Sequence, residues 1–362
     1  MRRYAFHTLA GLVAALLASP AHSSSSAGAP RDAETRVFAT LPADVRHPEA
    51  LAVDERDGSI VVATFDARPV EADRRNALLK YSASGELLGR RDFGPTPLTG
   101  ITVRNGMIYL LNFGASKLQR LSVDLDSRTA IQDLLSFVAL SPTAPAPRII
   151  ANPDGSTDTV TFGSKGFPAP NGLVFGKDGT LYVTDSFQGA VYRVRSAETC
   201  APCLLEVVSR DPLLATSGAL PFGANGVAFL EDPAKLYVNN AGDGRVLELN
   251  LTTGIIQVLA ESLFGADGLT AHSGHLWVAA NQIDRVVAID SSGKTAAVVG
   301  RFEGINPDGS PRGFLFPAAA VASGERMVVA NLALPLTPVQ GDEWEEDVTR
   351  WNLYLFDIPH FK

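Results

Sequence analysis

A short unit of two apolar runs joined by a tight turn recurs along this chain, and it constrains the fold more than any other feature. Its clearest copy spans residues 170–186, where apolar runs that begin at Asn171 and end at Asp185 flank the turn Asp178-Gly179. Two apolar runs around Asp-Gly are a strong β-hairpin signal. Because a hairpin brings its ends together, we expect Asn171 and Asp185 at the same edge of the unit.

The hairpin recurs six times, at intervals typical of a β-propeller. The other five copies have turns near residues 57–58, 105–106, 232–233, 273–274 and 323–324. A third alternating run follows each hairpin and a fourth follows most, which predicts four antiparallel strands per unit. Such units bury both faces only by packing on one another around an axis, so the sequence predicts an all-β, six-bladed β-propeller. Helical periodicity is nearly absent, and residues 131–138 are the best candidate for a short helix.

The ends of the chain and two insertions complete this plan. The sixth unit has no fourth run after it, whereas residues 35–41 look like a fourth strand. We therefore expect this N-terminal strand to pair with blade six and close the ring, which removes an exposed sheet edge. Long insertions interrupt the repeat at residues 126–167, between blades two and three, and at 335–350, within blade six. Strand alternation predicts that both insertions rim the face that carries Asn171.

The N-terminus has the pattern of a targeting segment. Arg2 and Arg3 precede an apolar run at residues 9–18 that is too short to span a bilayer, and small residues follow it. The expected domains are a signal peptide at 1–23, a flexible linker at 24–34 and the propeller at 35–362. We predict an exported protein, periplasmic or secreted, with no stable membrane insertion after cleavage; an uncleaved anchor is the alternative.

Composition limits the partners. The formal net charge of the 362-residue chain is −8, which argues against nucleic acid, because that partner requires a basic face. A small-molecule substrate and a monomeric state are the expectations that remain.

The only two cysteines of the sequence, Cys200 and Cys203, stand in Thr-Cys-Ala-Pro-Cys. In an oxidising compartment this pair predicts a small disulfide that pins a loop. A redox C-x-x-C is the alternative, but that motif calls for a strand-to-helix context, and this one lies between two strand-like runs.

Polar residues recur at one position of the repeat, the residue that enters the first strand of each unit. Through the six units this position holds Glu49, Thr99, Asn171, Asn225, Asp267 and Pro317. In a propeller it faces the axis, so four oxygen ligands would converge there, which suits Ca²⁺ or another divalent cation. Histidine and sulfur are missing from the set, which disfavours zinc or copper. The structural alternative is that Asn-Gly and Asp-Gly simply start strands, since both are turn formers.

The repeat resembles the gluconolactonase–regucalcin family of six-bladed propellers, with paraoxonase and diisopropylfluorophosphatase as more distant relatives. The resemblance covers about residues 35–358, and its most specific part is Pro170-Asn171-Gly172-Leu173 followed by the run 181–186. It implies that a Glu, two Asn and an Asp from blades one, three, four and five hold a divalent metal. The matching residues in this chain are Glu49, Asn171, Asn225 and Asp267. Blade one departs from the family's Glu-Gly-Pro, since Glu49 stands in Pro-Glu-Ala-Leu, closer to NHL-repeat propellers.

These observations predict a metal-dependent hydrolase of lactones or esters. The ion would polarise the substrate carbonyl, and Asp267, by resemblance, is the candidate general base. His47 is a second candidate base, whereas His272 and His275 flank a turn at the opposite mouth. Residues expected on the metal face, where they would shape the pocket or cap loops, are Thr99, Asp185, Asn239, Asn240 and Asn281.

Two other functions stay open at the level of sequence. One is a non-catalytic, NHL-like propeller that binds a small ligand, a sugar or a protein partner, because the fold alone does not decide function. The other is condensation chemistry like that of strictosidine synthase. Neither Gly-x-Ser-x-Gly nor a P-loop occurs in the sequence.

Overall fold

The computed structural model describes residues 33–140, 146–161, 166–216, 218, 220–337 and 340–361. The predicted signal peptide and linker residues 24–32 lie outside this part of the chain. Within the described ranges, no helix is long and apolar enough to span a bilayer.

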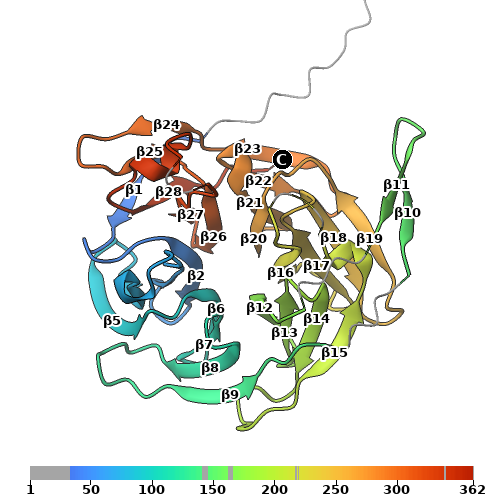
Figure 1. Ribbon diagram of the computed structural model, residues 1–362, viewed down its shortest axis with the longest axis horizontal. Coiled ribbons are helices and arrows are strands. Elements are labelled where there is room, and N and C mark those ends of the chain that lie inside the picture. Colours follow the sequence, from blue (N-terminus) through green and yellow to red (C-terminus); the bar gives the residue numbers. More distant parts are fainter. Residues whose placement is uncertain are drawn as a thin grey trace, which may run out of the picture.

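Six four-stranded antiparallel sheets stand around a central axis, which confirms the predicted six-bladed β-propeller (Figure 1). Blade one contains β2 (Pro48–Asp54), β3 (Ser59–Thr64), β4 (Asn76–Tyr81) and β5 (Leu87–Gly94). Blade two contains β6 (Leu98–Arg104), β7 (Met107–Asn112), β8 (Lys117–Ser122) and β9 (Gln132–Ser136). Blade three contains β12 (Pro170–Phe175), β13 (Leu181–Asp185), β14 (Ala190–Val194) and β15 (Glu206–Arg210).

The remaining blades repeat the pattern. Blade four contains β16 (Ala224–Phe229), β17 (Lys235–Asn240), β18 (Arg245–Asn250) and β19 (Ile256–Ala260). Blade five contains β20 (Ala266–His272), β21 (His275–Ala280), β22 (Arg285–Ile289) and β23 (Thr295–Val299). Blade six contains β26 (Pro317–Ser323), β27 (Arg326–Asn331), β28 (Asn352–Asp357) and, from the other end of the chain, β1 (Thr35–Thr40). The first strand of each blade lies nearest the axis (Figure 1).

The N-terminal strand closes the ring, as predicted. β1 pairs antiparallel with β28, from Thr35 opposite Phe356 to Thr40 opposite Asn352. Figure 1 shows this junction as a blue strand beside red ones. Pairing the two ends of the chain leaves blade six with four strands, so no blade is left incomplete at the closure.

Apolar side chains from neighbouring blades form the core. Between blades four and five, for example, Tyr237 and Val246 of one sheet pack with Leu269, Val278 and Val287 of the next, all of them buried. Each strand presents alternate residues to its two faces, and both faces of an inner strand meet another blade. This explains why the second strands read as nearly continuous apolar runs.

A bulge at the start of every first strand aims one residue at the axis. In blade three, Pro170 pairs with Asp185 and the next pair is Leu173 with Val183, so Asn171 and Gly172 both face Thr184. Equivalent register shifts occur in the other five first strands. An extra residue of this kind redirects its side chain and bends the strand.

The glycine after the axial residue has a packing role, not a turn role. A Cβ built on Gly172 would lie 2.4 Å from the carbonyl oxygen of Asn225 in the next blade. Gly226 is equally confined, with Asp267 O at 2.4 Å from such a Cβ. Asn-Gly therefore recurs because neighbouring first strands approach too closely for a side chain.

In blade six the residue at the axis differs from the predicted one. In blade six, Pro317 pairs with Asn331 and the next pair is Ala319 with Ala330, so Ala318 occupies the position of Glu49. Ala318, not Pro317, lines the channel. The prediction of Pro317 was wrong by one residue: Pro317 pairs across its hairpin as Pro48 and Pro170 do, so the axial residue is the one after it.

The predicted helix at 131–138 was also wrong. This segment forms β9, which pairs with β8 and buries Leu134, 1 % exposed, against blades two and three. The free edge of β8 and the gap between the blades outweigh the weak local preference of this short segment. The insertion after blade two is consequently shorter than predicted, and its hairpin of β10 (Arg148–Ala151) and β11 (Thr157–Val160) stands outside the ring (Figure 1).

A second small hairpin was not predicted. β24 (Phe302–Ile305) and β25 (Pro311–Gly313) lie between blades five and six and pair around the turn Asp308-Gly309. The insertion at 335–350 follows β27, as predicted, and carries a short 3₁₀ helix, η4 (Trp344–Asp347).

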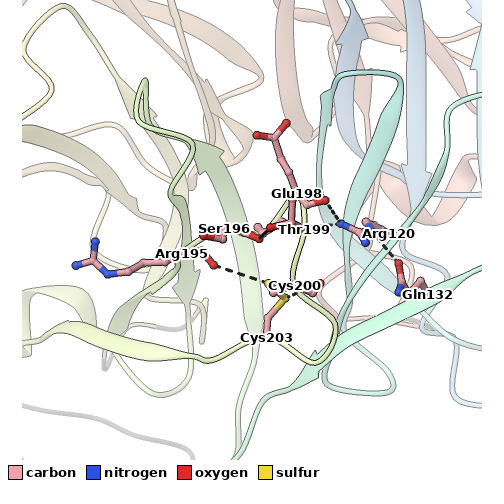
Figure 2. Close-up of a disulfide and its surroundings, with 9 residues drawn as sticks. Arg120, Gln132, Arg195, Ser196, Glu198, Thr199, Cys200 and Cys203 are labelled. Carbon is pink, nitrogen blue, oxygen red and sulfur yellow. Dashed lines mark hydrogen bonds between the residues drawn. A yellow bond between two sulfur atoms is a disulfide. The ribbon is translucent and has the colours of Figure 1, made fainter.

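The two cysteines form a disulfide within the loop between β14 and β15 (Figure 2). The same loop is fixed to blade two, because Cys203 N donates to Leu134 O (2.7 Å) and Arg120 donates to Ala197 O (3.0 Å). A loop between two strands differs from the strand-to-helix setting of a redox motif. The disulfide therefore pins a loop between blades, the first of the two interpretations.

Candidate functional site

A ring of polar side chains closes the channel at one mouth of the propeller. Its members are contributed by the bulged first strands of five blades. They are Glu49, Thr99, Asn171, Asn225 and Asp267. All five line both the channel below the ring and the pocket above it, so the ring is the floor of that pocket. The structure thus brings together the four residues that the sequence analysis assigned to a metal.

Two carboxylates of the ring, Glu49 and Asp267, lie close enough to influence each other. Asp267 is 6 % exposed, and the accessible surface of Glu49 faces the channel that the six first strands enclose. Burial raises the pKa of Asp267 to about 7, although hydrogen bonds from Asn281 and Asn225 lower it. Burial, and after it the charge of Asp267, raise the pKa of Glu49 well above its ordinary value. No ion pair among the described residues compensates either group.

The two ring amides are held by their nitrogen atoms. Asn171 Nδ2 donates to Ser186 Oγ (3.2 Å), and Asn225 donates to Asp267. Ser186 in turn donates to Ala224 O (2.7 Å), which fixes it between blades three and four. With the nitrogens engaged, both amides keep an oxygen for another partner.

Two further asparagines support the ring from blades four and five. Asn281 Nδ2 donates to Asp267 Oδ2 (3.0 Å), and Asn239 Nδ2 donates to Asp267 O (2.8 Å). Asn281 also lines the pocket, whereas Asn239 does not. The remaining oxygens of both amides are buried and have no hydrogen-bond partner among the residues that the structure describes. Of the two, Asn281 is placed to orient the Asp267 carboxylate.

The donor set of the ring fits a hard divalent cation. Within the described ranges, no group of three or more His, Cys, Asp or Glu could hold a metal. The ring instead offers two carboxylates and two amide oxygens, which are oxygen ligands of the kind that Ca²⁺ prefers. Two buried carboxylates without a cation are unfavourable, and a divalent ion would neutralise them.

Thr99 of the ring and Ala318, at the equivalent position of blade six, do not provide a carboxylate or amide oxygen for a cation. Thr99 Oγ1 donates to Pro170 O (2.7 Å), so its hydroxyl hydrogen joins blades two and three. Ala318 has no polar side chain. The oxygen ligands therefore come from blades one, three, four and five.

Asp185 lies at the same mouth, yet outside the residues that line the pocket. Its Oδ1 accepts hydrogen bonds from three backbone N–H groups, those of Ala169 (2.9 Å), Phe187 (3.1 Å) and Gln188 (2.9 Å). Its Oδ2 lies 3.4 Å from Tyr192 Oη, which donates to it. Asp185 therefore ties together the loops before β12 and after β13. Asn240 has a similar role, since its Nδ2 donates to Leu213 O and Ala215 O (both 2.8 Å).

His47 is also outside the pocket lining. Its ring is 4 % exposed, lies 3.0 Å from Leu332 O through Nδ1, and meets Trp351 edge to face. Burial lowers the pKa of His47 to about 4. A neutral imidazole packed beneath the loop after β27 has a structural role at this position.

Apolar residues above the ring are the part of the site that sequence reasoning missed. Those that line the pocket are Phe65, Leu220, Phe222, Ala241, Phe316, Leu332, Leu334 and Leu336. A signal for them does exist in the repeat. Phe65, Ala241 and Leu332 directly follow the second strands of their blades, as Asn281 does in blade five. In these blades, the residue at that position lines the pocket just above the axial ring.

Comparison with solved structures finds the same architecture in proteins of very different sequence. A luciferin-regenerating enzyme has a TM-score of 0.59 and 14 % identity, with 90 % of this chain and 95 % of that chain covered. A gluconolactonase from Xanthomonas campestris has a TM-score of 0.54 and 15 % identity, with 91 % of each chain covered. Regucalcin from Agrobacterium tumefaciens, a calcium-binding protein, has a TM-score of 0.55 and 13 % identity, with 90 % and 94 % covered.

Neither a protein-family model nor a curated protein matches the sequence. At these identities the structural likeness establishes the fold. In architecture, the chain is therefore a six-bladed β-propeller like those of the gluconolactonase and regucalcin structures, as the resemblance in sequence predicted.

Proposed function

We propose that this protein is a hydrolase of lactones or esters that depends on a divalent cation, with Ca²⁺ the favoured ion. The observation that carries the proposal is the pair Glu49 and Asp267 at the axis. Both carboxylates have raised pKa values, chiefly from burial, and neither has a cationic partner among the described residues. Such a pair is costly when both groups are ionised, and a positive ligand would remove that cost. Asn171 and Asn225 supply two further oxygens at the same level of the channel.

The four residues that would hold the ion are Glu49, Asn171, Asn225 and Asp267. When bound, a divalent cation polarises the substrate carbonyl and stabilises the negative charge that develops on its oxygen. Two structural neighbours, a gluconolactonase and a calcium-binding protein, agree with this chemistry.

Asp267 is the candidate general base. Asn281 donates to its Oδ2 (3.0 Å) and Asn225 also donates to the carboxylate, so the group is oriented to accept a proton from water. A carboxylate beside a cation has a depressed pKa and is a weak base. The site is therefore suited to lactones and activated esters, whose carbonyls are more reactive than those of amides.

Calcium binding and hydrolysis test the proposal together. Wild-type protein should bind Ca²⁺ in a calorimetric titration, and it should hydrolyse members of a lactone and aryl-ester panel with Ca²⁺ but not with chelator. Glu49→Gln removes one anionic ligand and should weaken Ca²⁺ binding at least about tenfold, because ligand charge tunes affinity. Asp124→Asn is the matched control, since that side chain is 79 % exposed and lies outside the pocket lining.

Hydrolysis that is absent throughout, or unaffected by chelator and by Glu49→Gln, would contradict the hydrolase. Ligand binding without hydrolysis would instead support the non-catalytic propeller.

Export belongs to the same proposal. The Cys200–Cys203 disulfide supports an oxidising compartment. The test is the N-terminal sequence of protein recovered from outside the cytoplasm, which should begin near residue 24. Recovery with Met1 or residue 2 at its start would contradict cleavage of the signal peptide.

A further inference from the structure

The pocket above the ring has a polar floor and an apolar wall. Its floor is the polar ring, and its wall consists of the eight apolar residues named above. Among the described lining residues, the only polar side chain above the ring is Asn281, whose amide nitrogen donates to Asp267 and whose oxygen is buried. The space between the atoms of the pocket is about 430 Å³ with open solvent at its mouth included, and the part that a water-sized sphere can occupy is about 40 Å³.

The backbone of this wall also offers a ligand few groups for hydrogen bonding. Leu332 O already accepts from Trp351 Nε1 (3.1 Å) and lies 3.0 Å from His47 Nδ1. Phe316 O accepts from Leu332 N (3.1 Å), and Phe222 O accepts from Gly242 N (2.7 Å). A ligand hydroxyl that faces these residues would lose its hydrogen bonds to water. The carbonyl groups it meets already accept hydrogen bonds from the protein.

The wall is supported by a row of aromatic rings across four blades. Ring centroids of successive members lie 5.3 Å apart for Phe65 and Phe113, 6.4 Å for Phe113 and Phe187, and 5.2 Å for Phe187 and Phe222. Phe65 and Phe222, the two ends of this row, are the members that line the pocket. Edge-to-face and tilted contacts of this kind hold ring positions.

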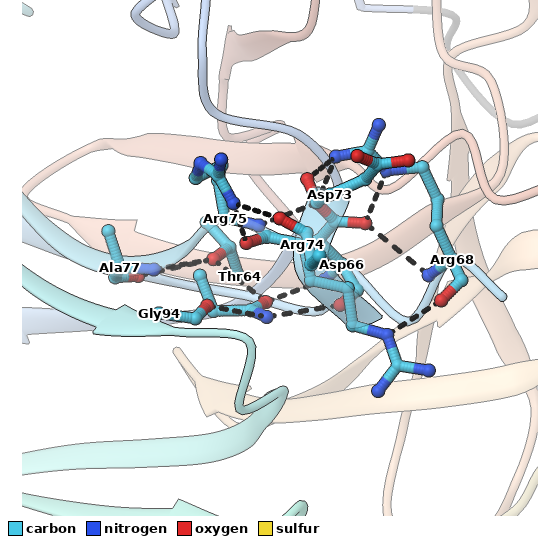
Figure 3. Close-up of polar contacts among 10 residues, drawn as sticks. Thr64, Asp66, Arg68, Asp73, Arg74, Arg75, Ala77 and Gly94 are labelled. Carbon is cyan, nitrogen blue, oxygen red and sulfur yellow. Dashed lines mark hydrogen bonds and ion pairs between the residues drawn. The ribbon is translucent and has the colours of Figure 1, made fainter. Parts of the chain in front are cut away.

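The loop after Phe65 is held firmly as well (Figure 3). Asp66 accepts hydrogen bonds from Arg68 Nε (2.8 Å) and Arg75 N (2.8 Å), and Asp66 N donates to Asn76 Oδ1 (2.6 Å). These contacts engage the charged groups of the loop with one another, so that the loop presents Phe65 to the pocket. The apolar wall is therefore preformed rather than assembled on binding.

We propose that the ligand of this pocket is an uncharged ester or lactone whose remaining surface is apolar, and not a polyhydroxylated sugar lactone. The ester part rests on the proposed function, whereas the apolar part rests on the wall alone. A sugar lactone would leave several hydroxyls without partners, and each would weaken binding by roughly fivefold to a hundredfold. An alkyl or aryl group instead gains from every methylene that the wall removes from water. Phe65, Phe222, Phe316 and Leu336 then determine specificity.

A series of ketones with alkyl chains of increasing length tests whether the pocket prefers apolar ligands, and it does not require hydrolysis. The probes are 2-alkylcyclopentanones, in which CH₂ replaces the ring oxygen of the lactone, with methyl, butyl and hexyl chains. Calorimetry on the full-length mature protein, with Ca²⁺ and with chelator, should show Kd tightening by about fourfold per added CH₂ until the pocket is filled. Gluconolactone should bind more weakly than the hexyl ketone.

Two variants and one control locate the effect in the wall. Leu336→Ser changes a side chain that is 44 % exposed, so folding is not at risk, and it should weaken hexyl binding about tenfold while leaving methyl binding nearly unchanged. Phe222→Ser, at a half-buried position, should act in the same direction. Phe167→Ser is the control, because Phe167 contacts Phe187 (5.2 Å) from outside the pocket and is 54 % exposed.

The possible outcomes separate this inference from the proposed function. A Kd independent of chain length, the absence of ketone binding, or a preference for gluconolactone would overturn the inference, even if lactone hydrolysis were observed. A chain-length ladder in a protein that hydrolyses nothing would overturn the hydrolase and leave the apolar ligand standing.

Discussion

Asp185 and Asp267 are the same residue type at the same mouth of the propeller, and both side chains are buried, at 0 % and 6 % exposure. Burial raises the pKa of both. Their partners differ. Asp185 accepts three backbone N–H groups on one oxygen, whereas Asp267 accepts from two asparagine side chains and lies near a second carboxylate, Glu49.

This contrast separates a carboxylate with a structural role from the one that we propose binds a cation. Donors that point at Asp185 stabilise its charge and fix two loops around it. The charge of ionised Asp267 is less well compensated, since the neighbouring carboxylate of Glu49 opposes its ionisation. Substitution of the two residues should therefore separate folding from function.

The largest effect is expected from Asp267→Asn on hydrolysis. The amide is isosteric but cannot accept a proton as a base, so we expect kcat/KM to fall by about 10²–10⁴-fold. The free energy of unfolding should stay the same or rise, because the variant removes one of two opposed carboxylates. Steady-state kinetics and urea unfolding measure the two quantities, and a strongly destabilised variant would show that Asp267 resembles Asp185.

Asp185→Ala should have the opposite profile. Three buried N–H groups lose their acceptor, and each orphaned group costs about 1–3 kcal/mol, so we expect a loss of at least about 3 kcal/mol in urea unfolding. Asp185→Asn, which keeps one acceptor oxygen, should lose less. Activity per folded molecule should persist, and its disappearance in a folded variant would place Asp185 in the functional site after all.

Asn281→Ala tests whether the partner of Asp267 positions it. Loss of the 3.0 Å hydrogen bond to Asp267 Oδ2 should lower kcat about tenfold, in the range seen when residues that orient a ligand are removed. Asn281→Asp places a third carboxylate beside the pair and should raise the pH at which activity appears. A kcat unchanged in both variants would remove Asn281 from the mechanism.

The smallest effect is expected in the pH dependence of the metal-free protein. The pKa of Asp267 is raised from 3.8 to about 7 in the folded state, so the folded protein binds more protons than the unfolded chain in this window. Its contribution to stability is therefore fully present below about pH 4 and is lost as the pH rises through 7. Scanning calorimetry in chelator should show this decline, and Asp267→Asn should flatten it.

Added Ca²⁺ should oppose the decline, because the cation binds only the ionised pair. Glu49 titrates with Asp267, so the curve belongs to the pair rather than to either residue. A difference between wild type and Asp267→Asn that grows as the pH falls would contradict the raised pKa.

Most of the architecture could be read from the sequence because the repeat is built from local signals. Turns such as Asp178-Gly179 and the apolar runs around them are short-range patterns, and six copies of the pattern leave few folds to choose from. The strand at 35–41 could be assigned to blade six because a propeller needs every blade complete.

Two local predictions failed for different reasons. Gln132–Ser136, inside the predicted helix, form β9 because β8 offers an open edge and a neighbouring blade buries Leu134. Ala318 rather than Pro317 faces the axis because Pro317 holds the paired position of Pro48 and Pro170, and no polar residue of β26 marks the axial one.

What the sequence by itself determined is the ring: six hairpins, their order, and Glu, Asn, Asn and Asp at one position of four of them. Their recurrence at a fixed place in the repeat is enough to predict convergence, since equivalent positions of a closed ring meet at its axis. What only the tertiary structure decided is which polar groups are satisfied and what covers them. Asp185 receives its donors from residues 169–192, whereas Asp267 accepts from Asn281 and lies near Glu49 of a distant blade. The wall from Phe65 to Leu336 gathers loops of several blades. Hydrogen-bond satisfaction and burial depend on all neighbours at once, so the pattern of the repeat does not give them.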